Sequence, residues 1–111
     1  EPVALEQIIH NLLTNALQAL DQVPAQERKL SVRLEADQGE GALTVGDSGP
    51  GIAPDVLPRI FEPFFTTREN GLGLGLSLCE SLAAGMGGRL GVQPRSPRGA
   101  AFTLRLPLAT A

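Results

Sequence analysis

The sequence predicts an α+β fold of two layers, in which two long helices cover one face of a mixed, mostly antiparallel sheet. Two long segments repeat apolar residues at helical spacing, and shorter segments alternate apolar and polar residues. Their order is helix, strand, strand, helix, strand, strand. Consecutive strands pair most simply as hairpins, so this order gives two hairpins in one sheet. With 111 residues, the chain can form one domain, over residues 1–111, with a single modest core.

The first helix is predicted over residues 3–20, where apolar residues recur at steps of three and four; they are Leu5, Ile8, Ile9, Leu12, Leu13, Ala16, Leu17 and Leu20. A second helix is predicted from about Gly73 to Met86, and Gly87-Gly88 supplies its stop signal. Cys79, the single cysteine, lies inside this helix. A buried, unreactive thiol is the more common state of such a residue.

Four strands are expected. Residues 30–36 alternate apolar and polar side chains, which predicts a half-buried strand. Residues 37–41 have hairpin-turn composition and lead into a short strand over 42–46. Residues 90–92 and 100–107 form the second pair. Between the two pairs, one or two helical turns are expected through Asp55 to Phe61.

The charge balance excludes one class of partner and allows another. Nine basic and twelve acidic side chains give a net charge of −3, so the broad positive field of a nucleic-acid-binding surface is absent. Backbone amides and a metal ion can still hold a nucleotide. No apolar run approaches the roughly 18 residues of a membrane span. We expect a cytoplasmic domain, whose parent protein can still be membrane-anchored.

Polar residues form one ridge along the first helix, at Gln7, Asn11, Asn15 and Gln18. Asparagine is a poor helix former, and Glu or Lys would serve a solvent-exposed face better. Amide oxygens are hard ligands that suit Mg²⁺ when phosphate and water complete the shell. A polar helix edge without any ligand explains this ridge equally well.

The segment from Asp47 to Ile52 directly follows a strand and is rich in glycine. A carboxylate at a strand end can accept a hydrogen bond from an exocyclic amine such as that of adenine, and glycines let a flat ring approach the backbone. We expect Asp47 to be partly exposed there. Taken alone, the segment is more simply a turn.

The alternating glycines Gly71, Gly73 and Gly75 open the second helix, where free backbone amides can bind an anion. The pattern alone is weak evidence. It does not match the dinucleotide-binding fingerprint, and the Lys-Ser/Thr pair of the phosphate-binding loop is missing.

Four motifs in one order resemble the catalytic domain of sensor histidine kinases, within the ATPase fold shared with gyrase, HSP90 and MutL. Residues 11–16 resemble the family's N box, 47–51 its first glycine box, 61–65 its phenylalanine box and 71–75 its second glycine box. The resemblance extends from Leu5 to Pro107. It is strongest to nitrogen-sensing and dicarboxylate-sensing kinases.

The resemblance implies roles for individual residues. Asn15 would be the Mg²⁺ ligand, Asn11 a second polar contact in the catalytic centre, and Asp47 the acceptor of the adenine amine. A mobile lid would span Glu62 to Leu72. Phe61 would belong to the core, with Phe64 and Phe65 at the base of the lid. The implied ATP contacts are Asn11, Asn15, Asp47, Gly49, Gly51, Ile52, Phe64, Thr67, Arg68, Gly71, Leu72, Gly73, Leu74, Gly75 and Leu76.

The same resemblance implies a function. The domain would bind ATP–Mg²⁺ and donate the γ-phosphoryl group to a histidine on a separate dimerisation domain, which this chain lacks. The full-length kinase would be a homodimer that passes the phosphoryl group to a response regulator. Asn11 stands where hydrolysing relatives carry a glutamate, and an amide cannot take a proton, so hydrolysis should be slow. His10 has no adjacent acidic residue and does not match the phosphoacceptor motif, so the isolated chain should not phosphorylate itself.

Several departures from the family keep other interpretations open. Between Thr67 and Gly71, the lid is about two residues shorter than in the family members that this sequence most resembles. Gln18 and Ala100 replace a Lys and a Thr that other branches carry, and the family's first strand would precede Glu1. A degenerate module that regulates only by docking is one alternative. A serine kinase of the anti-sigma-factor type is another, although the phenylalanine box argues against it.

Overall fold

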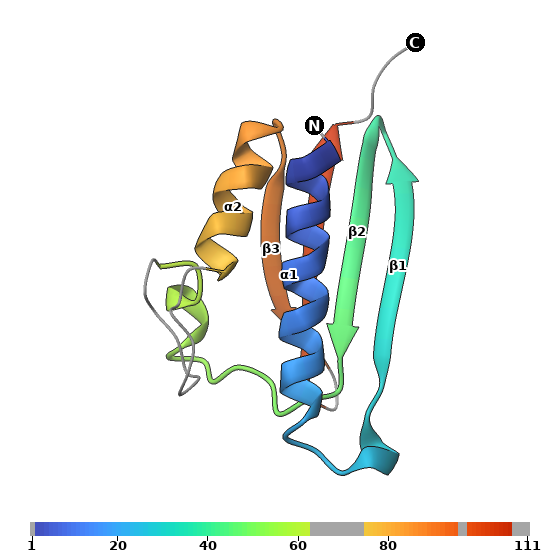
Figure 1. Ribbon diagram of the computed structural model, residues 1–111, viewed down its shortest axis with the longest axis vertical. Coiled ribbons are helices and arrows are strands. Elements are labelled where there is room, and N and C mark those ends of the chain that lie inside the picture. The colour runs from blue at the N-terminus through green and yellow to red at the C-terminus, as the bar shows by residue number, and fades with distance from the viewer. Residues whose placement is uncertain (1, 63–74, 96–97, 108–111) are drawn as a thin grey trace.

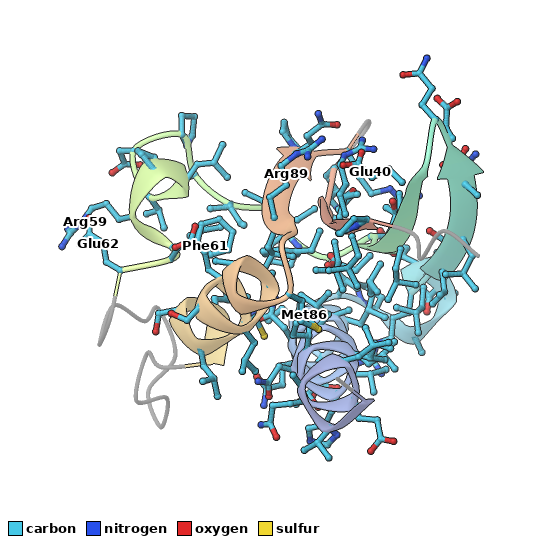
Figure 2. All side chains as sticks on the ribbon, turned by 90° about the horizontal axis from the view of Figure 1, so that it is seen from above. Glu40, Arg59, Phe61, Glu62, Met86 and Arg89 are labelled. Atoms are coloured by element: carbon cyan, nitrogen blue, oxygen red, sulfur yellow. The ribbon has the colours of Figure 1, made fainter. Side chains whose placement is uncertain are left out.

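The computed structural model describes residues 2–62, 75–95 and 98–107. Two helices lie on one face of a four-stranded sheet and leave the other face open, as Figures 1 and 2 show. The two-layer α+β architecture predicted from the sequence is confirmed. The α-helices and strands are α1 (Pro2–Leu20), β1 (Leu30–Asp37), β2 (Glu40–Asp47), α2 (Gly75–Gly85), β3 (Arg89–Pro94) and β4 (Ala100–Pro107), with short 3-10 helices at Ala25–Glu27 and Leu57–Arg59.

The strand order in the sheet is β1-β2-β4-β3. Each of the three pairings among the described strands is antiparallel, and β4 lies between β2 and β3. The register places Val45 of β2 beside Val32 of β1 on one side and Phe102 of β4 on the other. Side chains that are directly opposite in a sheet lie on the same face. Val45 and Phe102 are buried under the helices, so this register defines the inner face of the sheet.

The core fills the space between the helices and the inner face of β2, β4 and β3. Ile8, Leu12 and Cys79 are at most 1% exposed, in agreement with the predicted apolar faces of both helices. Phe61 packs edge-to-face on Phe102 with ring centroids 6.4 Å apart, which confirms its predicted place in the core. Figure 2 shows Met86 in the helix layer, and it packs against the same cluster.

Two glycine-containing segments fix the ends of elements. After α2, Gly87 takes a left-handed conformation, and the N–H of Gly88 donates to the carbonyl of Ala83 at 2.9 Å. This is the hydrogen-bond pattern with which a glycine commonly ends a helix. Gln38 and Gly39 have φ of 52° and 79° and form a tight two-residue turn between β1 and β2. The second strand therefore begins at Glu40 and is longer than the sequence predicted.

The prediction that the first strand is half-buried is wrong. Leu30, Val32 and Leu34 are 41%, 54% and 80% exposed. They lie on the inner face, beside residues of β2, but Figure 1 shows α1 lying over the middle of the sheet and leaving β1 uncovered. The alternation of side chains was predicted correctly, whereas the width of the helix layer was not.

Among the described residues, the helices include none with the length and hydropathy needed to cross a membrane.

Candidate functional site

Asp47 ends β2 and is the buried charged residue of the described chain, with 2% of its surface exposed. The prediction of a partly exposed side chain is therefore wrong. The carboxylate is directed inward because Asp47 shares the inner face with Val45, two residues earlier. The N–H of Gly49 donates to its Oδ1 at 2.9 Å. Burial raises the pKa of Asp47, and hydrogen bonds from the backbone of Gly49 and Ala100, with the nearby charge of Arg95, only partly oppose that rise.

Glycines let the backbone around Asp47 fold tightly. A Cβ on Gly49 would lie 2.9 Å from the Cβ of Ala19 on α1, closer than side chains approach. Gly51 has a φ of 82°, and a Cβ added to it would lie 3.4 Å from the carbonyl oxygen of Gly99. Gly99 has a φ of 116°, and a Cβ there would overlap the carbonyl oxygen of Asp47. The segment after β2 is thus held between the end of α1 and the start of β4.

The predicted polar ridge of α1 divides into two kinds of position. Gln7 and Gln18 are exposed, whereas Asn11 and Asn15 are half-buried. Burial raises the pKa of the Cys79 thiol, and the nearby side chain of Asn11 partly opposes that rise. This contact places the Asn11 side chain on the α2 side of α1.

The helix geometry then places Asn15. Figure 1 shows that α1 and α2 run in opposite directions. Asn11 meets Cys79, and Asn15 follows one turn later on the same face of α1, about 6 Å along its axis. One turn back from Cys79 on α2 is Gly75, where that helix begins. Asn15 therefore lies level with the N-terminus of α2, whose free amides favour negative charge.

The other predicted contacts are described in part. Ile52 and Leu76 are half-buried and pack against the core. His10 is exposed on α1. Gly75 begins α2, as predicted for the last glycine of its motif. The remaining predicted contacts, and most of the predicted lid, lie outside the described residues: Phe64, Phe65, Thr67, Arg68, Gly71, Leu72, Gly73 and Leu74.

Sequence reasoning missed three residues that pack around the end of β2 and the segment after it. Ala19 packs against Gly49, and Gly99 lies against Asp47 and Gly51 from the other end of the chain. Arg95 reaches the outer face of the sheet beside Gly46, and its Nη1 is buried without a hydrogen-bond partner in the described part of the chain. Only Gly99 left a signal, as a glycine between a charged turn and an apolar strand.

A family model, that of the histidine kinase-, DNA gyrase B- and HSP90-like ATPases, matches residues 1–110. This chain belongs to that ATPase family. The C4-dicarboxylate transport sensor protein DctB of Rhizobium meliloti is 42% identical over 107 residues, which cover 96% of this chain but 17% of DctB. The ATPase domain described here thus spans about a sixth of that sensor's length.

Solved histidine kinases share this ATPase fold. The catalytic domain of histidine kinase ThkA superposes with a TM-score of 0.83 at 30% identity, over 96% of this chain and 68% of ThkA's. Full-length ShkA, solved in complex with AMPPNP, superposes with a TM-score of 0.81 at 38% identity, over 97% of this chain and 22% of ShkA's. The predicted similarity to sensor histidine kinases, including those that sense dicarboxylates, is confirmed.

The donor set around Asp47, Asn11 and Asn15 fits an ATP–Mg²⁺ complex. The described residues contain no group of three or more His, Cys, Asp or Glu side chains that could hold a metal ion by themselves. Amide oxygens such as those of Asn11 and Asn15 suit Mg²⁺ when phosphate and water supply its other ligands. The backbone around Asp47 is packed so closely at Gly49 and Gly99 that neither position has room for a side chain.

Proposed function

We propose that this domain binds ATP with Mg²⁺ and donates the γ-phosphoryl group to a histidine on a separate dimerisation domain of a two-component sensor kinase. The observation that carries the proposal is the buried carboxylate of Asp47, held at a strand end among glycines and without an ion-pair partner among the described residues. Membership of the ATPase family and the AMPPNP complex of ShkA support it.

Asp47 would recognise the adenine ring. Its carboxylate already accepts a hydrogen bond from Gly49, and an ionised carboxylate has acceptor capacity for more. Burying a carboxylate whose oxygens lack hydrogen-bond donors is costly, and the exocyclic amine of adenine would supply one more donor to Asp47. Guanine presents a carbonyl at the matching ring position, and a carboxylate would repel it. This proposal therefore includes a preference for adenine over guanine.

Asn15 and Asn11 would act on the phosphate side. Asn15 lies level with the start of α2, so one amide oxygen can face a cation while the helix amides face phosphate oxygens. Bound Mg²⁺ would supply neutralisation of the phosphate charge that builds up during transfer. Asn11 lies near Cys79, on the side of α1 that faces α2.

The acceptor histidine would come from another domain. His10 is exposed and directly precedes Asn11 in α1. Adjacent residues of an α-helix are about 100° apart around its axis, so the His10 side chain points away from the amide ridge. Transfer requires a nucleophile in line with the γ-phosphorus at near-contact distance. In the proposed sequence, the phosphoryl group passes from ATP to a histidine of the homodimeric kinase. It then passes from that histidine to a response regulator.

The alternative is a domain that regulates by docking and transfers nothing. It is favoured by the short lid predicted between Thr67 and Gly71. Such a domain would hold nucleotide or nothing, so the two functions differ in whether a phosphoryl group reaches the histidine of an added dimerisation domain.

Calorimetry of ATP binding to purified variants tests the proposal. Asp47→Ala should weaken ATP binding at least several-fold, because a lost hydrogen bond costs about 0.5–1.5 kcal/mol and the vacated pocket adds to this. Asn15→Ala should remove the dependence of affinity on Mg²⁺. Gln18→Ala, on an exposed position of the same ridge, is the matched control and should change neither. Folded Asp47→Ala with wild-type affinity, or Asn15→Ala with wild-type Mg²⁺ dependence, would refute the corresponding assignment.

A further inference from the structure

The guanidinium group of Arg95 lies on the face of the sheet that the helices leave open. A Cβ added to Gly46 of β2 would lie 2.8 Å from Nη1 of Arg95 and 3.1 Å from its Cζ. Arg95 directly follows β3, and β4 lies between β3 and β2, so the side chain extends across β4 to reach Gly46. Its backbone N–H donates to the carbonyl of Gly99 at 3.0 Å, which anchors the turn. A positive charge is therefore held over the residue that precedes Asp47.

Gly46 provides the space that the guanidinium group occupies. Its φ is not in the left-handed region, so the backbone does not require a glycine there. Gly46 is buried although it lies on the open face of the sheet. Ser31 of β1 flanks it, with Oγ 3.0 Å from the same added Cβ. A glycine inside a strand often marks a place where another group approaches the backbone closely, and here that group is the Arg95 side chain.

The charge of Arg95 is not neutralised by a close partner. Its Nη1 is buried and has no hydrogen-bond partner in the described part of the chain. The ion pairs among the described residues do not include Arg95. Solvent screens a buried charge only weakly, so this charge acts on other buried charges nearby. Asp47, next to Gly46, is the buried charged residue of the described chain.

The other charged residues near Asp47 are exposed to solvent. They lie after the end of α1, before β1 and in the turn before β4: Asp21, Glu27, Arg28, Lys29 and Arg98. Arg98 is also paired with Glu27 at 2.9 Å. Exposed charges are strongly screened and contribute little. The guanidinium group behind β2 is thus the charge that can influence the Asp47 carboxylate.

We propose that Arg95 is a positioning residue for Asp47, whose carboxylate it keeps ionised from the opposite face of the sheet. The inference rests on the proposed recognition of adenine by Asp47. A direct ion pair would occupy the carboxylate oxygens, whereas a cation behind the strand leaves their acceptor capacity to the adenine amine. Ionised carboxylates accept stronger hydrogen bonds than neutral ones. Burial raises the pKa of Asp47, and the charge of Arg95 acts in the opposite direction.

Titration of the nucleotide-free chain tests the charge effect. NMR spectroscopy of the Asp47 carboxyl carbon gives the midpoint of its ionisation. Arg95→Gln should move that midpoint to higher pH, because the ionised form loses a favourable interaction. Arg95→Lys keeps the charge and should restore most of the wild-type midpoint. Arg98→Gln is the matched control, since it removes an exposed charge from the same turn and should leave the midpoint nearly unchanged.

Gly46→Ala tests the geometry without removing a charge. The added Cβ should displace the guanidinium group, and the fold should survive because only the end of a flexible side chain has to shift. The midpoint of Asp47 should then rise, as in Arg95→Gln. In a chain that already carries Arg95→Gln, Gly46→Ala should raise it no further, since no guanidinium group remains to be displaced.

Calorimetry over a range of pH connects this charge to nucleotide binding. Near the wild-type midpoint, Arg95→Gln should bind ATP about two-fold or more weakly, because less of Asp47 is ionised there. At a pH above both midpoints, the two affinities should converge. A direct contact between Arg95 and ATP would instead weaken binding at every pH.

The results separate this inference from the proposed function. A midpoint of Asp47 that Arg95→Gln leaves unchanged, or that Arg98→Gln moves as far, overturns the role of Arg95 whatever happens to ATP binding. ATP affinity that does not follow a shifted midpoint would overturn the recognition of adenine by Asp47 instead.

Discussion

At the scale of single residues, Asp47 combines a structural cost with a proposed use. Its carboxylate is buried and hydrogen-bonded by backbone amides, which compensate only part of the loss of hydration. Such a group is expected where a ligand supplies the remaining hydrogen bond. Stability and the proposed recognition of the nucleotide would therefore be linked at this residue.

The raised pKa of Asp47 predicts a pH dependence of stability. Because the pKa of the folded chain lies above the usual 3.8, the folded chain binds this proton more tightly than the unfolded chain. The free energy of unfolding then decreases as pH rises from 3.8 through the folded-state value. Asp47→Asn cannot ionise and lacks this component. Its stability relative to wild type should rise with pH over that window, as urea denaturation measures.

The control for that experiment is Asp55→Asn, which changes an exposed carboxyl group. A stability difference between Asp47→Asn and wild type that falls as pH rises would contradict the assignment of a raised pKa.

Gly99 provides a second prediction at this scale. A Cβ there would overlap the carbonyl oxygen of Asp47, and the φ of 116° is unfavourable for other residues. Gly99→Ala should lower the free energy of unfolding by more than about 2 kcal/mol. Gly91→Ala, in a strand and with open space around its Cα, should change it by no more than about 0.5–1 kcal/mol and in the stabilising direction. Thermal denaturation of the two variants compares them, and equal effects would exclude the proposed tight contact.

At the scale of elements, the glycines after α2 give a matched pair. Gly87 holds a left-handed conformation at the end of the helix, whereas Gly85 is helical and a Cβ there meets nothing within 4 Å. Gly87→Ala should destabilise the chain by about 1 kcal/mol, and Gly85→Ala should stabilise it by about 0.5–1 kcal/mol. Chemical denaturation gives both values. Stabilisation by Gly87→Ala would show that the helix ends differently.

Secondary structure was predictable where one local signal decided it. The spacing of Ile8, Leu12 and Ala16 predicted α1 and its buried face, and the pair Gly87-Gly88 predicted the end of α2. The extent of β2 was predicted too short because the turn at Gln38-Gly39 is tighter than composition alone indicates. The exposure of β1 depends on how far the helix layer reaches, which no residue of β1 encodes.

The segments that form the candidate site could be predicted from the sequence, but their arrangement in space could not. The order of motifs predicted Asp47, Asn11 and Asn15, because each belongs to a short continuous pattern. The burial of Asp47 was missed, since it depends on tertiary neighbours such as Gly99, which lies far from it in the sequence. Tertiary neighbours of this kind leave no periodic signal.

At the scale of the whole molecule, the proposed nucleotide site lies where the end of β2 meets the end of α1 and the start of β4.

The central claim is that this domain donates phosphoryl groups to a histidine that it does not itself carry. The most direct test incubates the chain with ATP labelled at the γ-phosphate and Mg²⁺, alone and with the histidine-bearing dimerisation domain of its parent kinase, once ATP binding has been verified by calorimetry. Label should appear on the histidine of the added domain, because that domain supplies the missing nucleophile. None should appear on the chain alone. Label on His10 of the isolated chain, or no transfer in either mixture despite ATP binding, would contradict the account.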